Sequence, residues 1–138
     1  MVYYQTWNKN KYKNIKQTYK GVSYHSSKEA NKAYELDMLF KAGEIKKWTG
    51  QVKIEFNFKR KGKNDWILTN TPALKLKEKQ IDFKHLFNYF VDFKVWHNDG
   101  SIEYIEVKGM MLEPGKTKIA LLDILLTNHP TEYLTVER

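Results

Sequence analysis

Three residues in the segment 87–109 have side chains that can do chemistry together: Asp92, Glu106 and Lys108. Two neighbouring carboxylates repel each other and resist ionisation unless a cation lies between them. Their oxygens suit Mg²⁺ or Mn²⁺, which keep several water ligands and bind phosphate oxygens at the remaining positions. A lysine beside such an ion can orient or deprotonate a water, or offset charge that develops on a phosphate.

A tight turn in the same segment predicts the element that holds these residues. Polar and apolar residues alternate on both sides of 98–100, and this is the strongest short-range signal of a β-hairpin. A three-residue loop with Gly100 in the left-handed conformation is a favoured hairpin connection. This loop pairs His97 with Ser101 and thereby sets the register of the two strands.

In that register Asp92 lies directly opposite Glu106. Side chains alternate faces with a period of two, so Lys108 shares their face, as do Phe90 and Tyr104. A two-residue loop would instead put Asp92 and Glu106 on opposite faces. The alternative to a site is a solvated sheet face on which Lys108 is a cross-strand charge partner. Two aromatic residues on the face argue against that alternative.

The residues around the carboxylates resemble a known motif. They form the runs Val91-Asp92-Phe93 and Ile105-Glu106-Val107-Lys108. These runs resemble the split Asp…Glu-x-Lys signature of the restriction-endonuclease-like nucleases, the PD-(D/E)XK superfamily, with Val91 in place of the proline of its name. The resemblance implies that Asp92, Glu106 and the main-chain carbonyl of Val107 bind one or two Mg²⁺ ions, for which Mn²⁺ can substitute. It also implies that Lys108 positions or activates the attacking water, and that cleavage leaves 5′-phosphate and 3′-hydroxyl ends.

A predicted helix, 26–42, supplies a further acidic candidate, Glu29. Ser26 with Glu29 three residues later forms a capping box, and Gly43 closes the helix. The capping box alone explains Glu29 structurally. The start and end of this helix also resemble the N-terminal helix of a small, mostly phage-encoded branch of the superfamily, which implies that Glu29 holds a metal-bound water or a second ion. Its predicted apolar face consists of Ala30, Ala33, Tyr34, Leu36, Leu39 and Phe40.

A strand is predicted for 51–58 because its residues alternate between an apolar face and a wet face. The wet face carries Gln51, Glu55 and Asn57, among others. The resemblance implies that Gln51 lies near the scissile phosphate, whereas Glu55 is typical of a solvated strand residue.

The net charge of the chain is +8, from 24 Lys and Arg against 16 Asp and Glu, and this favours a polyanionic partner such as nucleic acid. The alternative is a charge that serves solubility. Only Arg60 and Arg138 are arginines, so binding to phosphates is favoured over direct reading of bases.

The chain contains no cysteine, which excludes disulfides and thiolate metal sites. No apolar run reaches membrane-spanning length and no signal peptide is evident, so we expect an intracellular, soluble protein.

Three basic regions are candidate contacts with nucleic acid. The segment 1–18 is predicted to be a polar arm that interleaves basic and aromatic residues. Such an arm can track phosphates and stack on exposed bases, and the alternative is that its aromatic residues pack on the domain or on a second subunit. The segment 59–82 is the least regular part and is predicted to be a basic insertion. The third region is the start of a predicted helix, 116–128. The candidate residues are Lys59, Arg60, Lys61, Lys63, Lys116 and Lys118.

The predicted order is helix, three strands, helix and a last strand over 131–137. This is the αβββαβ core of the restriction-endonuclease-like α/β fold, a mixed sheet of about four strands flanked by helices, in one domain over 19–138. The resemblance implies a Mg²⁺-dependent DNA endonuclease, with a phage recombination enzyme that resolves Holliday junctions as the leading expectation. We expect a homodimer acting on branched DNA in the host bacterial cytoplasm. The alternatives are a non-catalytic nucleic-acid-binding module and a general DNA or RNA nuclease or exonuclease of the same fold.

Overall fold

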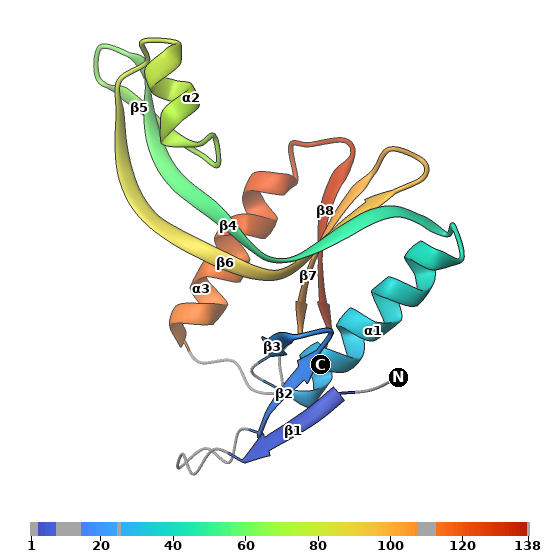
Figure 1. The fold of residues 1–138 in the computed structure, drawn as a ribbon. Helices are drawn as coiled ribbons and strands as arrows, with labels where there is room; N and C mark the ends of the chain where they lie inside the picture. The colour runs from blue at the N-terminus through green and yellow to red at the C-terminus, as the bar shows by residue number, and fades with distance from the viewer. Residues whose placement is uncertain (1–2, 8–14, 25, 108–112, 138) are drawn as a thin grey trace.

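A computed structural model describes residues 3–7, 15–24, 26–107 and 113–137 of the chain. The elements in chain order are β1 (Tyr3–Trp7), β2 (Ile15–Tyr19), β3 (Val22–Tyr24), α1 (Ser27–Lys41), β4 (Ile45–Gly62), β5 (Asp65–Thr69), α2 (Ala73–Glu78), β6 (Phe83–His97), β7 (Ile102–Val107), α3 (Glu113–Leu126) and β8 (Glu132–Glu137). Within the described residues, five strands form a mixed sheet in the order β5-β4-β6-β7-β8, and β1-β2-β3 form a separate antiparallel sheet. The protein is therefore an α/β protein, with one strand more in its main sheet than the sequence predicts (Figure 1).

Helix α1 begins and ends as its sequence predicts. The Ser26 hydroxyl accepts a hydrogen bond from the Glu29 N–H at 3.2 Å, which is the N-terminal half of the capping box. At the other end Gly43 has a φ of +77°, and the Glu44 N–H donates to the Leu39 carbonyl at 2.9 Å. This is the hydrogen bond of a glycine-terminated helix, so the predicted ends of the helix are confirmed.

One face of α1 packs on the main sheet. Ala30, Ala33 and Leu36 are buried in a cluster with Phe93 and Ile105 of the strands. The prediction that Phe40 joins this face is wrong, because its side chain is 48% exposed. The packed face of the helix therefore extends to Leu39, which is half-buried against this cluster, but not to Phe40.

Asp37 is a buried carboxylate of α1 that the sequence pattern does not single out. The Tyr19 hydroxyl donates to it at 2.8 Å, and the ammonium groups of Lys20 and Lys41 lie 2.5 and 3.4 Å away. The hydrogen bond from Lys20 lowers the pKa of Asp37 to about 2, against the opposing effect of burial, and Tyr19 and Lys41 add to the lowering. This carboxylate therefore ties β2 and the following turn to α1.

We expect Asp37→Asn to lower the free energy of unfolding by about 1–2 kcal/mol at neutral pH. Because the folded pKa is depressed, the stabilisation is complete above the unfolded pKa of 3.8 and is lost as the pH falls towards 2. Urea denaturation at neutral and acidic pH measures both effects. Glu35→Gln is the control, since Glu35 is an exposed partner of Lys32 and its loss is expected to change little. An equal difference between wild type and Asp37→Asn at both pH values would contradict the ion-pair account.

The small sheet lies beside the start of α1 (Figure 1). Lys20 and Gly21, with φ of +50° and +79°, form the turn between β2 and β3. The buried rings of Tyr19 and Tyr24 join the cluster under α1. The sequence predicts the segment 1–18 only as a basic and aromatic arm, whereas its described part forms β1 and most of β2. Strands β1 and β2 pair with each other. The alternation of polar and apolar residues within one short segment does not reveal which other segment it pairs with.

The hairpin of β6 and β7 has the predicted register. Phe93 pairs with Ile105 and Trp96 with Ile102. The His97 N–H donates to the Ser101 carbonyl at 2.9 Å, and Gly100 has a φ of +90°. The three-residue loop is therefore confirmed, and the next step of the same register sets Asp92 opposite Glu106.

Strand β6 leaves β7 at Asp92. The β6–β7 ladder ends at the pair Phe93 and Ile105, whereas β6 stays paired with β4 along the rest of its length. Phe93 belongs to the cluster under α1, whereas Val91 belongs to the second cluster, with Leu122 of α3. Residues 91 and 93 would share one face of a flat strand, so the β4–β6 ribbon must turn over near Asp92. Phe90, predicted on the face of Asp92, is instead 59% exposed on the side of the ribbon away from the α3 cluster.

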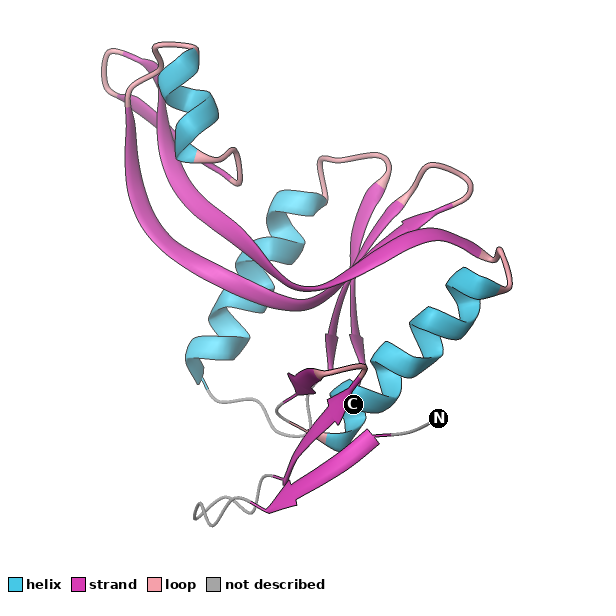
Figure 2. Ribbon diagram, in the orientation of Figure 1, coloured by secondary structure: helices cyan, strands magenta, loops and turns pink. Residues whose placement is uncertain are grey.

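Beyond this point β4 and β6 form a curved arm that carries β5 and α2 at its far end (Figure 2). The sequence predicts 59–82 as the least regular stretch, but here the residues form the end of β4, then β5 and α2. A register shift after Phe56 also corrects the predicted wet face, because it turns Asn57 inward. The Asn57 amide donates to the Thr71 carbonyl at 2.9 Å, and its oxygen lies 2.8 Å from Nδ1 of His85.

Helix α3 covers the other face of the sheet and begins three residues before the predicted start. Leu122 and Leu126 are buried in a cluster with Tyr104 of β7. After α3 the chain enters β8, which pairs with β7 in parallel. Among the described helices, none combines the length and the apolar character needed to cross a membrane.

Candidate functional site

Asp92 and Glu106 lie at the point where β6 separates from β7. The Asp92 Oδ2 atom accepts a hydrogen bond from the main-chain N–H of Val107 at 2.7 Å. The side chain therefore replaces the backbone partner that β6 would have supplied had the ladder continued. Glu106 is fully buried, with 0% of its surface exposed. Placing a carboxylate in the interior is costly unless other groups stabilise it, so this position needs a specific explanation.

Tyr89 holds Glu106 from the opposite strand. Its hydroxyl donates to Oε2 of Glu106 at 2.7 Å. Burial raises the pKa of Tyr89 above its ordinary value, and the hydrogen bond to Glu106 and the charges of Glu106 and Asp92 raise it further. The hydroxyl therefore stays protonated and donates. The sequence pattern missed Tyr89 because an odd-numbered residue of a flat β6 would point away from Glu106.

We expect Tyr89→Phe to lower the free energy of unfolding by about 1–3 kcal/mol, because a buried carboxylate loses a donor. Urea denaturation measures this loss. Tyr104→Phe is a matched control, since Tyr104 is also buried and its hydroxyl donates to a carboxylate, Glu132, which is only half-buried. Equal losses in the two variants would show that the hydrogen bond to Glu106 contributes no more to the free energy of unfolding than the one to Glu132.

Gln51 lies on β4 beside Asp92. The pairs Gly50–Phe93 and Val52–Val91 flank it, so the register sets Gln51 opposite Asp92. Its φ is +53°, in the left-handed region that non-glycine residues rarely adopt. Backbone strain of this kind is typical of functional sites. The exposed side chain lines a hollow of about 330 Å³ together with Val22, Tyr24, Trp48, Thr49 and Gly50.

Glu29 lies in the first turn of α1, at the end of the helix that adjoins β7. Its side chain is only 6% exposed. Burial raises the pKa of Tyr24, and the charge of Glu29 is the next largest cause, so the two side chains are close. The neighbouring Ala30 packs in the same cluster as Val107, the last residue of β7. Glu29 thus joins the end of the sheet that carries Glu106.

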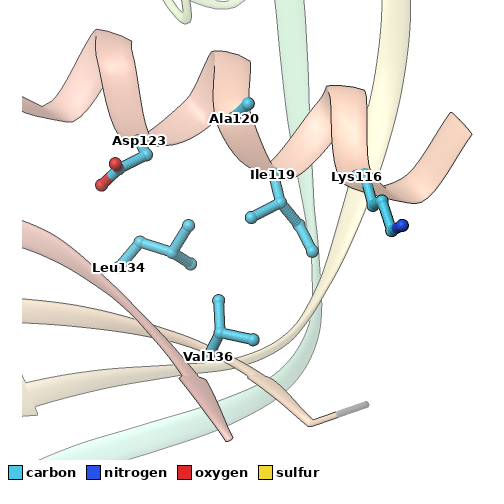
Figure 3. A pocket seen from close by; sticks show the side chains of 6 residues that line it. All are labelled: Lys116, Ile119, Ala120, Asp123, Leu134 and Val136. Carbon is cyan, nitrogen blue, oxygen red and sulfur yellow. The ribbon is translucent and has the colours of Figure 1, made fainter. Parts of the chain in front are cut away.

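Lys108 lies outside the described residues. Lys116 and Lys118 project from the first turns of α3 in different directions. Lys116 lines one end of a hollow of about 330 Å³ between α3 and β8, with Asp123 at the other end and apolar side chains between them (Figure 3). Val136 lines the same hollow and pairs with Glu106 in the sheet. The Lys118 ammonium lies 5.3 Å from the ring centroid of Phe87, on the side of the arm.

The basic residues of the arm are separate from this centre. Lys59, Arg60, Lys61 and Lys63 lie where β4 ends and turns into β5. The Arg60 guanidinium lies 4.4 Å from the ring centroid of Trp66 and 3.2 Å from Asp82. The structure therefore brings Asp92, Glu106 and Gln51 together and places Glu29 nearby, but it separates them from the basic turn of the arm.

The donor set of the described residues fits a hard divalent cation. It contains two carboxylates, Asp92 and Glu106, each with one oxygen held by a protein hydrogen bond. In the described part of the chain, no three His, Cys, Asp or Glu side chains come together as a metal-binding group. Two carboxylates suffice for Mg²⁺, which usually takes one or two from the protein and completes its shell with water and phosphate. The hydrogen bonds from Tyr89 and Val107 orient the oxygens, as outer-shell partners do.

Comparison with known proteins gives a family match. The family described as "Protein of unknown function (DUF1064)" matches residues 9–134, which is most of the chain. No curated protein and no solved structure matches.

Proposed function

We propose that this chain, which belongs to the DUF1064 family, is a metal-dependent nuclease that hydrolyses phosphodiester bonds in DNA. The observation that carries the proposal is the pair Asp92 and Glu106, which lie opposite each other where two strands separate. Each has one oxygen fixed by a hydrogen bond, from Val107 or from Tyr89. Glu106 has 0% of its surface exposed and lies beside a second carboxylate, an arrangement that costs free energy of folding. A cation bound between the two carboxylates would offset this cost.

The order of the elements supports a restriction-endonuclease-like core. With β5 and α2 set aside as an insertion, the order is α1, β4, β6, β7, α3 and β8. This is the expected αβββαβ succession, with β7 and β8 parallel and α1 and α3 on opposite faces. The two candidate carboxylates stand on the second and third of its strands, where the resemblance to the PD-(D/E)XK superfamily implies them.

In the proposed mechanism Asp92, Glu106 and the main-chain carbonyl of Val107 would hold Mg²⁺, or Mn²⁺ in its place. When bound, the ion supplies Lewis-acid polarisation of the phosphate and stabilises the leaving oxygen. Tyr89 keeps the Glu106 carboxylate oriented by donating to Oε2.

Three further side chains act around that centre in the proposal. Gln51, strained and exposed beside Asp92, can donate its amide N–H groups to a phosphate oxygen. Glu29 holds a water at the end of α1. Lys108 positions the attacking water or takes its proton.

The proposed substrate is branched DNA. The charge of +8 and the scarcity of arginine favour contacts with phosphates over reading of bases, so the shape of the nucleic acid would select it. The arm adds basic residues far from the carboxylates, which suits a substrate with several duplex branches. Paired nicks need two active sites, so the proposal includes a homodimer. It also includes action in the cytoplasm of a bacterial host, as a phage recombination enzyme.

Cleavage of a labelled four-way junction beside linear duplex and single strand tests the proposal. Each reaction is run with Mg²⁺, with Mn²⁺ and with EDTA. Paired symmetric nicks on the junction alone, absent in EDTA, are the expected result. Cutting of all three substrates in a metal-dependent manner would replace the resolving enzyme by a general nuclease. Binding without cutting under every condition would overturn catalysis and leave a nucleic-acid-binding module.

A further inference from the structure

Trp96, near the end of β6, carries two ammonium groups over its ring. The Lys47 Nζ atom lies 4.3 Å from the ring centroid and the Lys94 Nζ atom lies 4.6 Å from it. Lys47 is the strand partner of Trp96 on β4, and Lys94 is two residues before it on β6. Attraction between a cation and an aromatic face holds such groups in place, so the ring fixes the positions of both ammonium groups.

This lysine pair faces the same side of the sheet as Glu106. The Lys94 ammonium also lies 5.5 Å from the ring centroid of Tyr104, its partner on β7. Tyr104 and Glu106 are two residues apart on β7, so they share a face and lie about 7 Å apart along the strand. Trp96 lies opposite Ile102, a further two residues from Glu106, so a phosphate between the two lysines lies on the order of 13 Å from Glu106 along the strand. A DNA strand of a few nucleotides spans that distance.

The charges of the cluster favour an anion. Two ammonium groups held over one ring repel each other, and an anion between them relieves the repulsion. The acidic residue in the same row of the sheet is Glu132, which pairs with Ile102 opposite Trp96. Its oxygens are engaged by the Tyr104 hydroxyl at 3.1 Å and by Nδ1 of His129 at 3.1 Å. Lys47 is exposed and Lys94 half-buried, so an anion can reach both.

We infer that Lys47 and Lys94, positioned by Trp96, form a clamp for a backbone phosphate of the DNA strand that enters the carboxylate site. This inference rests on the proposed nuclease function and names the subsite that holds the strand beside the cleaved bond. The clamp acts on the phosphate charge, so it serves any base sequence. The clamp lies on the sheet face of Glu106, whereas the basic turn lies at the far end of the arm.

Binding of a fluorescein-labelled oligothymidylate, measured by anisotropy in EDTA over a series of salt concentrations, tests the clamp without relying on cleavage. We expect Lys47→Gln/Lys94→Gln to weaken binding by about tenfold. The slope of log affinity against log salt should become shallower by roughly 0.7 for each phosphate that the variant no longer neutralises. Trp96→Leu keeps both charges and should still weaken binding several-fold, because the ammonium groups lose their platform. Thermal unfolding checks that each variant is folded.

Lys46→Gln/Lys53→Gln is the matched control, because it removes the same charge from exposed positions of β4. An equal loss in this control, or full binding by Trp96→Leu, would show that bulk charge alone acts and would overturn the clamp. Wild-type binding by Lys47→Gln/Lys94→Gln, with cleavage that still requires Asp92, would overturn the clamp and leave the nuclease intact. Failure of the wild-type protein to bind the oligonucleotide or the junction would overturn both.

Discussion

Asp92→Asn is expected to reduce metal-dependent cleavage of DNA by about a thousandfold, equivalent to about 4 kcal/mol of transition-state stabilisation. Asparagine keeps a side-chain oxygen that can accept the hydrogen bond from the Val107 N–H, which Asp92 accepts at 2.7 Å. The change therefore removes the negative charge while preserving the local backbone arrangement. Single-turnover rates on the preferred substrate measure the loss, and circular dichroism verifies the fold.

Glu55→Gln is the matched control for this experiment. Glu55 is also a strand carboxylate that accepts a backbone N–H, from Ala73 at 3.2 Å, but it lies on the arm away from the candidate site. We expect this variant to cleave at nearly the wild-type rate. Substantial cleavage by Asp92→Asn, or equal losses in the two variants, would remove Asp92 from the reaction.

Mg²⁺ and Mn²⁺ are expected to stabilise the folded protein, and Glu106→Gln is expected to abolish the effect. A ligand at about one hundred times its dissociation constant adds about 2.7 kcal/mol to the free energy of unfolding. For a domain of this size that corresponds to a rise of about 10 °C in the melting temperature. Glutamine retains an oxygen to accept the Tyr89 hydroxyl, so the variant should fold without metal but not respond to it. Differential scanning fluorimetry with increasing metal concentration measures the response.

The control for this second experiment is Glu132→Gln. Glu132 likewise accepts a tyrosine hydroxyl, from Tyr104 at 3.1 Å, but it stands at the far end of β8 from the partner of Glu106. Its metal response should match that of the wild type. A response that survives in Glu106→Gln would show that the ions bind elsewhere, and the proposed role of this carboxylate would then fail.

The elements predicted best are those whose signals are local. The three-residue loop around Gly100 sets the register that brings Asp92 opposite Glu106, and it depends on a left-handed conformation that glycine adopts without strain. The ends of α1 follow from Ser26 and Gly43 for a similar reason, because capping groups act within one helical turn.

The predictions that the structure corrects concern residues whose burial depends on contacts between segments far apart in the sequence. Asn57 alternates onto the wet face in the sequence, but it follows a register shift against β6 and is buried, with its amide donating to the Thr71 carbonyl. Phe40 fits the helical spacing but is 48% exposed, whereas its neighbour Leu39 packs against the cluster under α1. Neither outcome is encoded within a window of a few residues.

The sequence by itself therefore determined the hairpin loop, the register that brings Asp92 next to Glu106, and the first turn of α1 with Glu29. Tertiary structure alone decided that β6 parts from β7 at Asp92, that the ribbon turns over there, and that Tyr89 thereby reaches Glu106. It also decided that Lys47 and Lys94 share the ring of Trp96. The physical reason is that alternation and capping act over a few residues, whereas the packing of Phe93 under α1 and of Val91 against α3 joins segments far apart in the sequence.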